Sequence, residues 1–306
     1  MASFVHRAFR NHLIRPPAFL PNNLHYECMM GSRAYAVNEA DSSDYDIYGF
    51  VIPPKDILFP HLAGVIPGFG YQGQKFEQWQ EHHVEDKDAG KEYDFSIYNI
   101  VKYFQLCMDN NPNMVDSLFV PINCVLHSTQ IGNMVRDNRK LFLSKRVWFK
   151  FKGYAYGQMH KLDGKEPTGK RKESVDKYGF DVKYAYHIVR LMNECQQILT
   201  DGDVDLQRSK EELKSIRRGE WTEQRIKEYF ESSLPGLEDI YKKSTLPEHP
   251  PEDKIKKLLL ECLESHYGTL SGIVEQPDVA IQALRDIDII VSKARSVLWE
   301  NQPVSQ

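Results

Sequence analysis

Two short motifs near the start of the chain combine residue types that can hold phosphate and metal. Gly31-Ser32 follows the apolar segment HYECMM (25–30), and Asp44 and Asp46 come about a dozen residues later in DYDIYGFVI (44–52). Glycine lets a backbone approach a ligand closely, and the serine hydroxyl and neighbouring N–H groups can hold phosphate oxygens. In a strand, residues i and i+2 project from one face, so Asp44 and Asp46 are expected to point the same way.

Two carboxylates this close need a compensating charge. At about 4 Å they repel each other by roughly 1 kcal/mol in water, and by several times more when partly buried. Mg²⁺ compensates well, because it takes oxygen ligands from one or two carboxylates and fills its other positions with water and substrate phosphates. Taken singly, each motif is more typical of an ordinary turn or a solvated acidic edge. Their order and spacing favour a triphosphate cradle beside a metal site, suited to attack on an α-phosphate with pyrophosphate leaving.

The composition is that of a packed protein in a reducing compartment. The chain has 306 residues, 41% of them hydrophobic, which is enough to bury a sizeable core. Its five cysteines are scattered, odd in number and without a CxxC pair, so neither disulfides nor a thiolate zinc site are expected. The N-terminal residues lack the apolar core of a signal peptide, and no apolar run reaches membrane-spanning length. We therefore expect a cytoplasmic protein without a membrane partner.

The net charge of −4 does not indicate a nucleic-acid partner, and it does not exclude one. Two basic runs, RKLFLSKRVWFKFK (139–152) and KEPTGKRK (165–172), could contact a nucleic acid locally. The second lies in what we expect to be a flexible, solvated loop.

The order of predicted elements divides the chain into a mixed half and a helical half. Strands are predicted at 25–30, 44–52 and 92–97, and helices at 98–110 and 114–119. Residues 61–91 read as a long connection that includes GFGYQG (68–73) and the polar run EHHVED (81–86), which lacks zinc-ligand spacing. From about residue 147 the pattern is helical. A helix over 175–199 has the apolar stripe Val182, Ala185, Val189, Met192, Cys195 and Leu199.

These elements predict an α+β fold. We expect a small mixed-sheet catalytic domain over residues 1–145, followed by an all-helical domain over residues 146–306 that binds substrate or nucleotide.

The motifs resemble those of a known superfamily. Gly31-Ser32 followed by Ser43-Asp44-Tyr45-Asp46-Ile47 is similar to the GS…(S)DxD signature of DNA polymerase beta-type nucleotidyltransferases. The longer segments GSRAY (31–35) and SDYDIYGFVIPP (43–54) resemble a branch of that superfamily associated with RNA repair in bacteria and phages. The segments that share the resemblance, in the same order, are NNPNMVDSLFVP (110–121), FKGYAYGQMHKL (151–162), KYAYHIVRLMNECQQIL (183–199) and LKSIRRGEW (213–221). The family often has glycine where this chain has Ala36, so the turn after Gly31-Ser32 is expected to be slightly altered.

The resemblance implies a third carboxylate on the strand that follows the DxD motif. Asp94 is the better candidate, with Glu92 in reserve, because the segment that begins at Asp94 matches the family's pattern of an acid followed by a helix. Asp94 would bind metal with Asp44 and Asp46, and could accept the proton of the attacking hydroxyl. The implied cofactors are two Mg²⁺ or Mn²⁺ ions, with an NTP as substrate.

Further residues are assigned to nucleotide binding. Gly31, Ser32 and Arg33 lie in the phosphate turn, while Lys183, His187 and Arg190 fall at i, i+4 and i+7 of the predicted helix, as a cationic stripe. Such a stripe is either a solvated face or a set of contacts to triphosphate or acceptor backbone. The neighbouring tyrosines and the resemblance favour contacts.

The leading hypothesis is a metal-dependent nucleotidyltransferase that moves a nucleoside monophosphate from an NTP to a hydroxyl, with pyrophosphate release. The resemblance points to RNA as acceptor, either a tRNA or a damaged RNA end. The same chemistry could adenylylate a protein or a small molecule. From another class, a non-catalytic nucleotide or RNA sensor on the same fold stays open, although a binder has no reason to keep three crowded carboxylates.

Overall fold

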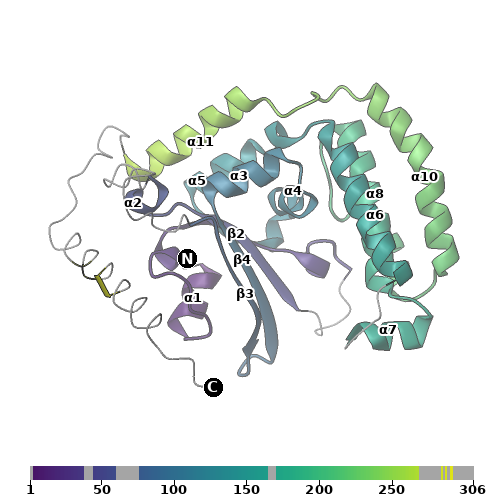
Figure 1. Cartoon of the computed structure of the whole chain (residues 1–306), viewed down its shortest axis with the longest axis horizontal. Helices are drawn as coiled ribbons and strands as arrows, with labels where there is room; N and C mark the ends of the chain where they lie inside the picture. Colours follow the sequence, from purple (N-terminus) through teal and green to yellow (C-terminus); the bar gives the residue numbers. More distant parts are fainter. Residues whose placement is uncertain are drawn as a thin grey trace, which may run out of the picture. The chain divides into compact units, whose positions relative to one another are not determined.

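A mixed five-stranded sheet carries both sequence motifs. The computed structural model describes residues 3–37, 44–59, 76–164 and 170–268, together with 284, 287, 290 and 291. The strands are β1 (Leu24–Met29), β2 (Tyr45–Val51), β3 (Gln78–Asp86), β4 (Lys91–Asn99) and β5 (Val125–Ser128), in the order β3-β4-β2-β1-β5. Figure 1 labels β2, β3 and β4. β2 and β4 are parallel, and the other neighbours are antiparallel.

Short helices cover the two faces of the sheet. On one face, Phe4 of α1 (Phe4–Arg10) contacts the rings of Tyr93 and Phe95. On the other face, Tyr103 of α3 (Ile100–Met108) packs on Phe50 of β2. The remaining helices of this part are α4 (Pro112–Phe119) and α5 (Gln130–Asp137) (Figure 1). Because side chains alternate along a strand, Asp46 projects to the same face as Phe50, the face that α3 partly covers.

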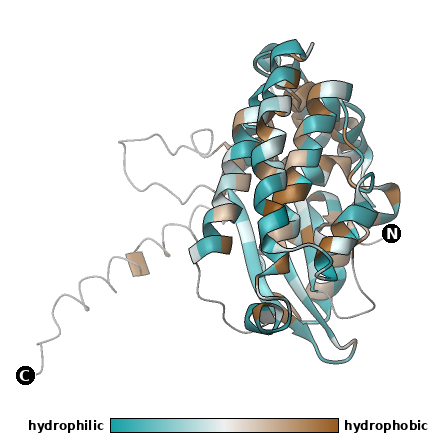
Figure 2. Ribbon diagram, turned by 90° about the vertical axis from the view of Figure 1, so that its right-hand side faces the viewer, coloured by the Kyte–Doolittle hydropathy of each residue, from teal (hydrophilic) through white to brown (hydrophobic). Residues whose placement is uncertain are grey.

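The helical half is built around one long helix. α8 (Val182–Asp201) packs against α6 (Arg146–Gly164), α9 (Lys210–Arg217) and α10 (Glu223–Lys243), and the other helices are α7 (Lys170–Tyr178) and α11 (Glu252–Tyr267). The predicted apolar stripe of α8 is buried at Ala185, Val189, Met192, Cys195 and Leu199. Figure 2 shows hydrophilic and hydrophobic residues mixed along these helices, as expected of amphipathic helices packed on a core.

Residues 1–52 and 77–266 form one compact unit, which holds the whole sheet and helices α6 to α10. Residues 53–76 and 267–306 form a second, in which the Tyr267 hydroxyl donates to the Pro53 carbonyl and Phe59 contacts the Tyr267 ring beside α2 (Lys55–Leu58). The α+β fold, with a mixed sheet followed by helices, is confirmed. The division at residue 145 stays a prediction.

Two predictions of loop structure are wrong. Residues 78–86 form the edge strand β3, although its mostly polar residues gave no apolar alternation to predict it from. Residues 170–172 begin helix α7, where Arg171 pairs with Asp181 instead of lying in a solvated loop. GFGYQG (68–73) and Ser43 lie outside the described residues.

Other sequence predictions can be compared directly with the structure. All five cysteines lie in the described part and are free, buried thiols, as expected of a chain without disulfides. Within the described residues, no helix has the length and apolar character needed to cross a membrane.

The turn after β1 contains a strained residue. Val37 N–H donates to the Ser32 carbonyl and Ala36 N–H to the Arg33 carbonyl, and these bonds close a compact turn. Ala36 has φ +52°, the left-handed region that glycine adopts freely and alanine does not. The alteration expected of this turn is therefore a strained backbone at Ala36 within a closed turn.

Ala36→Gly is expected to stabilise the protein. Relief of the left-handed strain gains about 1–2 kcal/mol, and the extra freedom of glycine in the unfolded chain takes back about 0.5–1 kcal/mol. The free energy of unfolding in urea should therefore rise by up to about 1 kcal/mol. Ala89→Gly is the control, because Ala89 lies in the β3–β4 turn without a positive φ and should lose stability. Equal losses in the two variants would contradict the strain at Ala36.

Candidate active site

The parallel pairing of β2 with β4 brings two of the predicted acids side by side. Asp46 is the direct partner of Asp94 in this register. Adjacent strands lie only about 4.8 Å apart, so the two carboxylates share one face of the sheet at close range. Asp44 precedes β2 by one residue and has the same parity as Asp46.

The charges around Asp46 confirm this crowding. The pKa of Asp46 is raised to about 6, first by burial and then by the carboxylates of Asp94 and Asp44, while the Lys183 ammonium lowers it. The charges of Asp44, Asp94 and Lys183 thus all act on Asp46, which lies near the start of β2.

Gly31 is in direct contact with Asp46. The Met30 N–H donates to the Asp46 carbonyl at 2.7 Å, which fixes the end of β1 against β2. Gly31 follows with φ +66°, and a β-carbon there would lie 2.0 Å from Asp46 Oδ2. A side chain at residue 31 would displace the Asp46 carboxylate and strain the left-handed backbone, so the predicted phosphate turn and the predicted metal ligand lie in contact.

The two residues after Gly31 have different settings. Ser32 is partly exposed in the 3₁₀ turn Gly31–Arg33. Arg33 lies 4.1 Å over the Tyr45 ring, and its Nη2 donates to the Tyr45 hydroxyl at 2.7 Å. Because Tyr45 alternates with Asp44 and Asp46, Arg33 packs on the opposite face of β2 from the acids.

The predicted cationic stripe of α8 is only partly correct. Lys183 is exposed and acts electrostatically on Asp46. The pKa of His187 is lowered by burial and by nearby cations, first among them Arg190, so this imidazole is neutral at pH 7. Its ring stacks on Tyr186 at 4.2 Å. Of the three stripe residues, Lys183 is therefore the one that is exposed and acts on Asp46.

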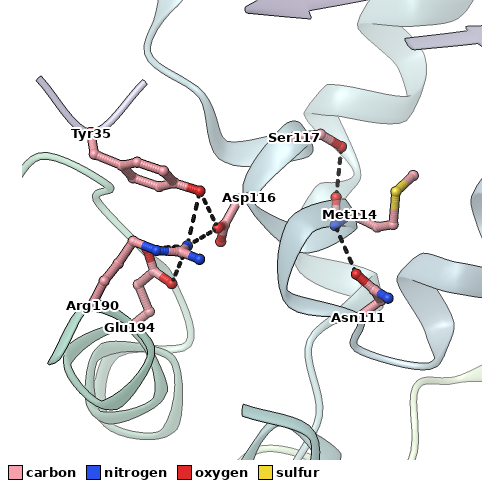
Figure 3. A network of polar contacts seen from close by, with 7 residues as sticks. All are labelled: Tyr35, Asn111, Met114, Asp116, Ser117, Arg190 and Glu194. Atoms are coloured by element: carbon pink, nitrogen blue, oxygen red, sulfur yellow. Dashed lines mark hydrogen bonds and ion pairs between the residues drawn. The ribbon is translucent and has the colours of Figure 1, made fainter. Parts of the chain in front are cut away.

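Arg190 belongs to a buried ionic network instead of an exposed stripe. Its Nη1 donates to Asp116 Oδ2, to Glu194 Oε2 at 3.0 Å and to the Tyr35 hydroxyl at 2.9 Å, and Tyr35 in turn donates to Asp116 at 2.7 Å (Figure 3). The side chains of Arg190, Asp116 and Glu194 are 5%, 0% and 3% exposed. The expectation that Arg190 faces nucleotide is not met, because partners that its helical spacing could not predict surround it.

One positive charge cannot neutralise two buried carboxylates. Burial raises the pKa of both Asp116 and Glu194, and Arg190 acts in the opposite direction on each. One proton shared within the network would balance its charge. Asp116 lies in the otherwise apolar and neutral segment MVDSLF, and a single acid in such a helix is the sequence signal that could have found this network.

His82 and His83, which were predicted to lie in a polar loop, contact the acids of β4. His83 N–H donates to Asp94 Oδ1 at 2.8 Å, and His82 Nδ1 lies 3.5 Å from the same oxygen. His83 Nδ1 lies 2.5 Å from Glu92 Oε1, and this bond to Glu92 raises the pKa of His83. Their signal in the sequence was the acid-flanked pair in EHHVED, which could be placed only once β3 was known to pair with β4.

The match to protein families covers most of the chain. The family model described as RlaP, the RNA repair pathway DNA polymerase beta family, matches residues 5–259. This chain belongs to that family. Membership in the RlaP family confirms the resemblance seen in the sequence, and it suggests nucleotidyl transfer as the general activity.

The other comparisons add little to the RlaP assignment. None of the curated proteins matches the chain. Among solved structures, a nucleotidyltransferase-like protein from Exiguobacterium sibiricum is similar over 87% of this chain and 81% of its own, with 9% identity and a TM-score of 0.27. A likeness that distant carries no argument about the function of this chain.

The acids of this RlaP-family chain fit a hard divalent cation in their chemistry. Within the described residues, no three His, Cys, Asp or Glu side chains already converge as a metal site. The carboxylates of Asp94 and Asp44 nevertheless act on Asp46, and Lys183 is the cation that most opposes them there. Carboxylate oxygens are the ligands that Mg²⁺ takes, so the residues present fit the ion that the family implies.

Asp46→Asn is expected to stabilise the protein at neutral pH when divalent cations are removed. The pKa of Asp46 is raised from 3.8 to about 6. The stability that goes with its protonated form is therefore fully present below pH 4 and is lost as the pH rises through 6. The ionised carboxylate then costs about 3 kcal/mol at pH 7.5. Urea unfolding from pH 3.5 to pH 8 should show a gain for Asp46→Asn only at the upper end.

Mg²⁺ supplies the matching control. It should raise the melting temperature of the wild-type chain and leave that of Asp46→Asn almost unchanged. A variant less stable than wild type at every pH would contradict the electrostatic strain assigned to Asp46.

Proposed function

We propose that this chain is a metal-dependent nucleotidyltransferase that moves a nucleoside monophosphate from an NTP to a hydroxyl group of RNA, releasing pyrophosphate. Its acceptor would be a tRNA or a damaged RNA end, as the RNA-repair description of the family suggests. Free thiols at all five cysteines support action in the reducing cytoplasm.

One observation carries the proposal. Asp46 is paired with Asp94 across parallel strands, and Gly31 lies against Asp46 with no room for a β-carbon. A phosphate-friendly turn, two neighbouring carboxylates and a third beside them thus lie within one corner of the sheet. Carboxylates crowded in this way weaken a fold unless a bound cation offsets their repulsion, and this favours a catalytic over a structural origin.

Each group has a role in the proposed reaction. Asp44, Asp46 and Asp94 would hold one or two Mg²⁺ or Mn²⁺ ions, which supply charge neutralisation for the triphosphate and the leaving pyrophosphate. Ser32 and the Gly31 backbone would hold phosphate oxygens, and the exposed Lys183 would approach the same phosphates from α8.

The proposal assigns the proton of the acceptor hydroxyl to Asp94. Asp94 would accept the hydroxyl proton as the acceptor oxygen bonds to the α-phosphorus and the bond to pyrophosphate breaks. His187 and Arg33 are assigned a supporting role at most, because one is neutral and the other packs on Tyr45.

The test is transfer of label from each of the four α-³²P-labelled NTPs to total RNA in the presence of Mg²⁺. Labelled RNA is the expected product, and Asp46→Asn and Asp94→Asn should each lower the rate by at least about 100-fold. Asp137→Asn is the control, because Asp137 is an exposed acid at the end of α5 and should transfer label at the wild-type rate.

Other outcomes would redirect or overturn the proposal. Label on cell protein or on a small molecule instead of RNA would keep the chemistry and change the acceptor. An NTP-dependent rise in melting temperature that is indifferent to Mg²⁺, with no labelled product, would indicate a sensor. Full activity in Asp46→Asn would show that the catalytic residues lie elsewhere.

A further inference from the structure

Strand β3 contains one extra residue directly opposite Asp94. In the β3–β4 register, Glu81 pairs with Phe95 and Val84 pairs with Tyr93, so His82 and His83 together face the single residue between them on β4. This is a β-bulge. Bulges are often found beside functional sites, where they re-aim a group that a regular ladder would leave in the sheet.

The bulge is held in a strained conformation. His83 has φ +56°, a left-handed backbone that costs a residue other than glycine about 1–2 kcal/mol. In return, its N–H points at the Asp94 carboxylate, with Oδ1 accepting at 2.8 Å. A strained residue that donates to a charged side chain is a sign of function, because it forms a strong, charge-assisted bond at a fixed place.

The side chain of His83 contacts Glu92, the other acid of β4. Its Nδ1 lies 2.5 Å from Glu92 Oε1, although the imidazole is 81% exposed. Glu92 and Asp94 project to the same face of β4, so His83 contacts both acids, one through its backbone and one through its ring. The two candidates for the third carboxylate are thereby distinguished: Glu92 pairs with an imidazole, whereas Asp94 receives a backbone amide and lies opposite Asp46.

We propose that the β3 bulge at His82 and His83 is a positioning element for Asp94, in which the His83 amide fixes Oδ1 and leaves Oδ2 for a metal ion or an acceptor proton. The proposal rests on the function proposed above. Asp94 lies beside Asp46, and two repelling carboxylates turn apart unless something holds them. The amide from the edge strand holds Asp94 in place without adding a mobile charge to the site.

Deletion of His83 tests the proposal, because it returns β3 to one-to-one pairing with β4 and removes the amide from Asp94. The full chain without NTP is titrated with Mn²⁺, and free Mn²⁺ is measured by electron paramagnetic resonance. Loss of a partner that orients a ligand typically weakens metal binding 10–100-fold, so the deletion should weaken it by at least about 10-fold.

His83→Gly is the matched control. Glycine keeps the bulge and its N–H, removes the imidazole and adopts the left-handed backbone without strain, so Mn²⁺ affinity should stay within about 3-fold of wild type. His83→Val is a second variant in case the deletion does not fold. Valine resists a positive φ and should weaken Mn²⁺ binding relative to His83→Gly.

The outcomes separate this proposal from the function on which it rests. Asp46→Asn is titrated first, and if it leaves Mn²⁺ affinity unchanged, the metal site itself is refuted. If Asp46→Asn weakens binding while a folded His83 deletion and His83→Val bind as tightly as wild type, only the positioning role of the bulge is overturned. Equal weakening by His83→Gly and the deletion would assign the effect to the imidazole and would also overturn it.

Discussion

The contact between Gly31 and Asp46 constrains the whole candidate site. A β-carbon at residue 31 would fall 2.0 Å from Asp46 Oδ2, and the Met30 amide is bonded to the Asp46 carbonyl in the same place. The turn that holds Ser32 is therefore fixed to the strand that holds the first carboxylates. The β2–β4 register then adds Asp94 on the other side of Asp46.

The buried network extends this constraint to the helical half. Tyr35 follows the Gly31 turn by four residues, and it bonds to Asp116 on α4 and to Arg190 on α8 (Figure 3). The same α8 carries Lys183, whose charge acts on Asp46. Removing Arg190 would leave two buried carboxylates without their counter-charge, which costs about 3–5 kcal/mol. The network thus ties the turn, the sheet and α8 together within one compact unit.

The sequence predicted what local patterns determine. Alternation in DYDIYGF predicted β2 with its acids on one face, and the apolar stripe of α8 predicted a helix that is now seen buried. It could not predict what partners determine. β3 is mostly polar and gains its place from pairing with β4, and the strain at His83 arises from a bulge that only this pairing defines. Helical spacing assigned Arg190 to a nucleotide-binding stripe, because its partner Asp116 lies 74 positions away in the chain and cannot be inferred from that spacing.

The most direct measurement of the central claim is the anomalous scattering of Mn²⁺ in crystals grown with a non-hydrolysable NTP. The account predicts a Mn²⁺ peak within about 2.2 Å of carboxylate oxygens of Asp46 and Asp94, the distance typical of hard divalent ions and oxygen ligands. It also predicts triphosphate density against the Gly31-Ser32 turn. Mn²⁺ and nucleotide bound away from these three residues, with the Asp46 and Asp94 carboxylates unliganded, would contradict it.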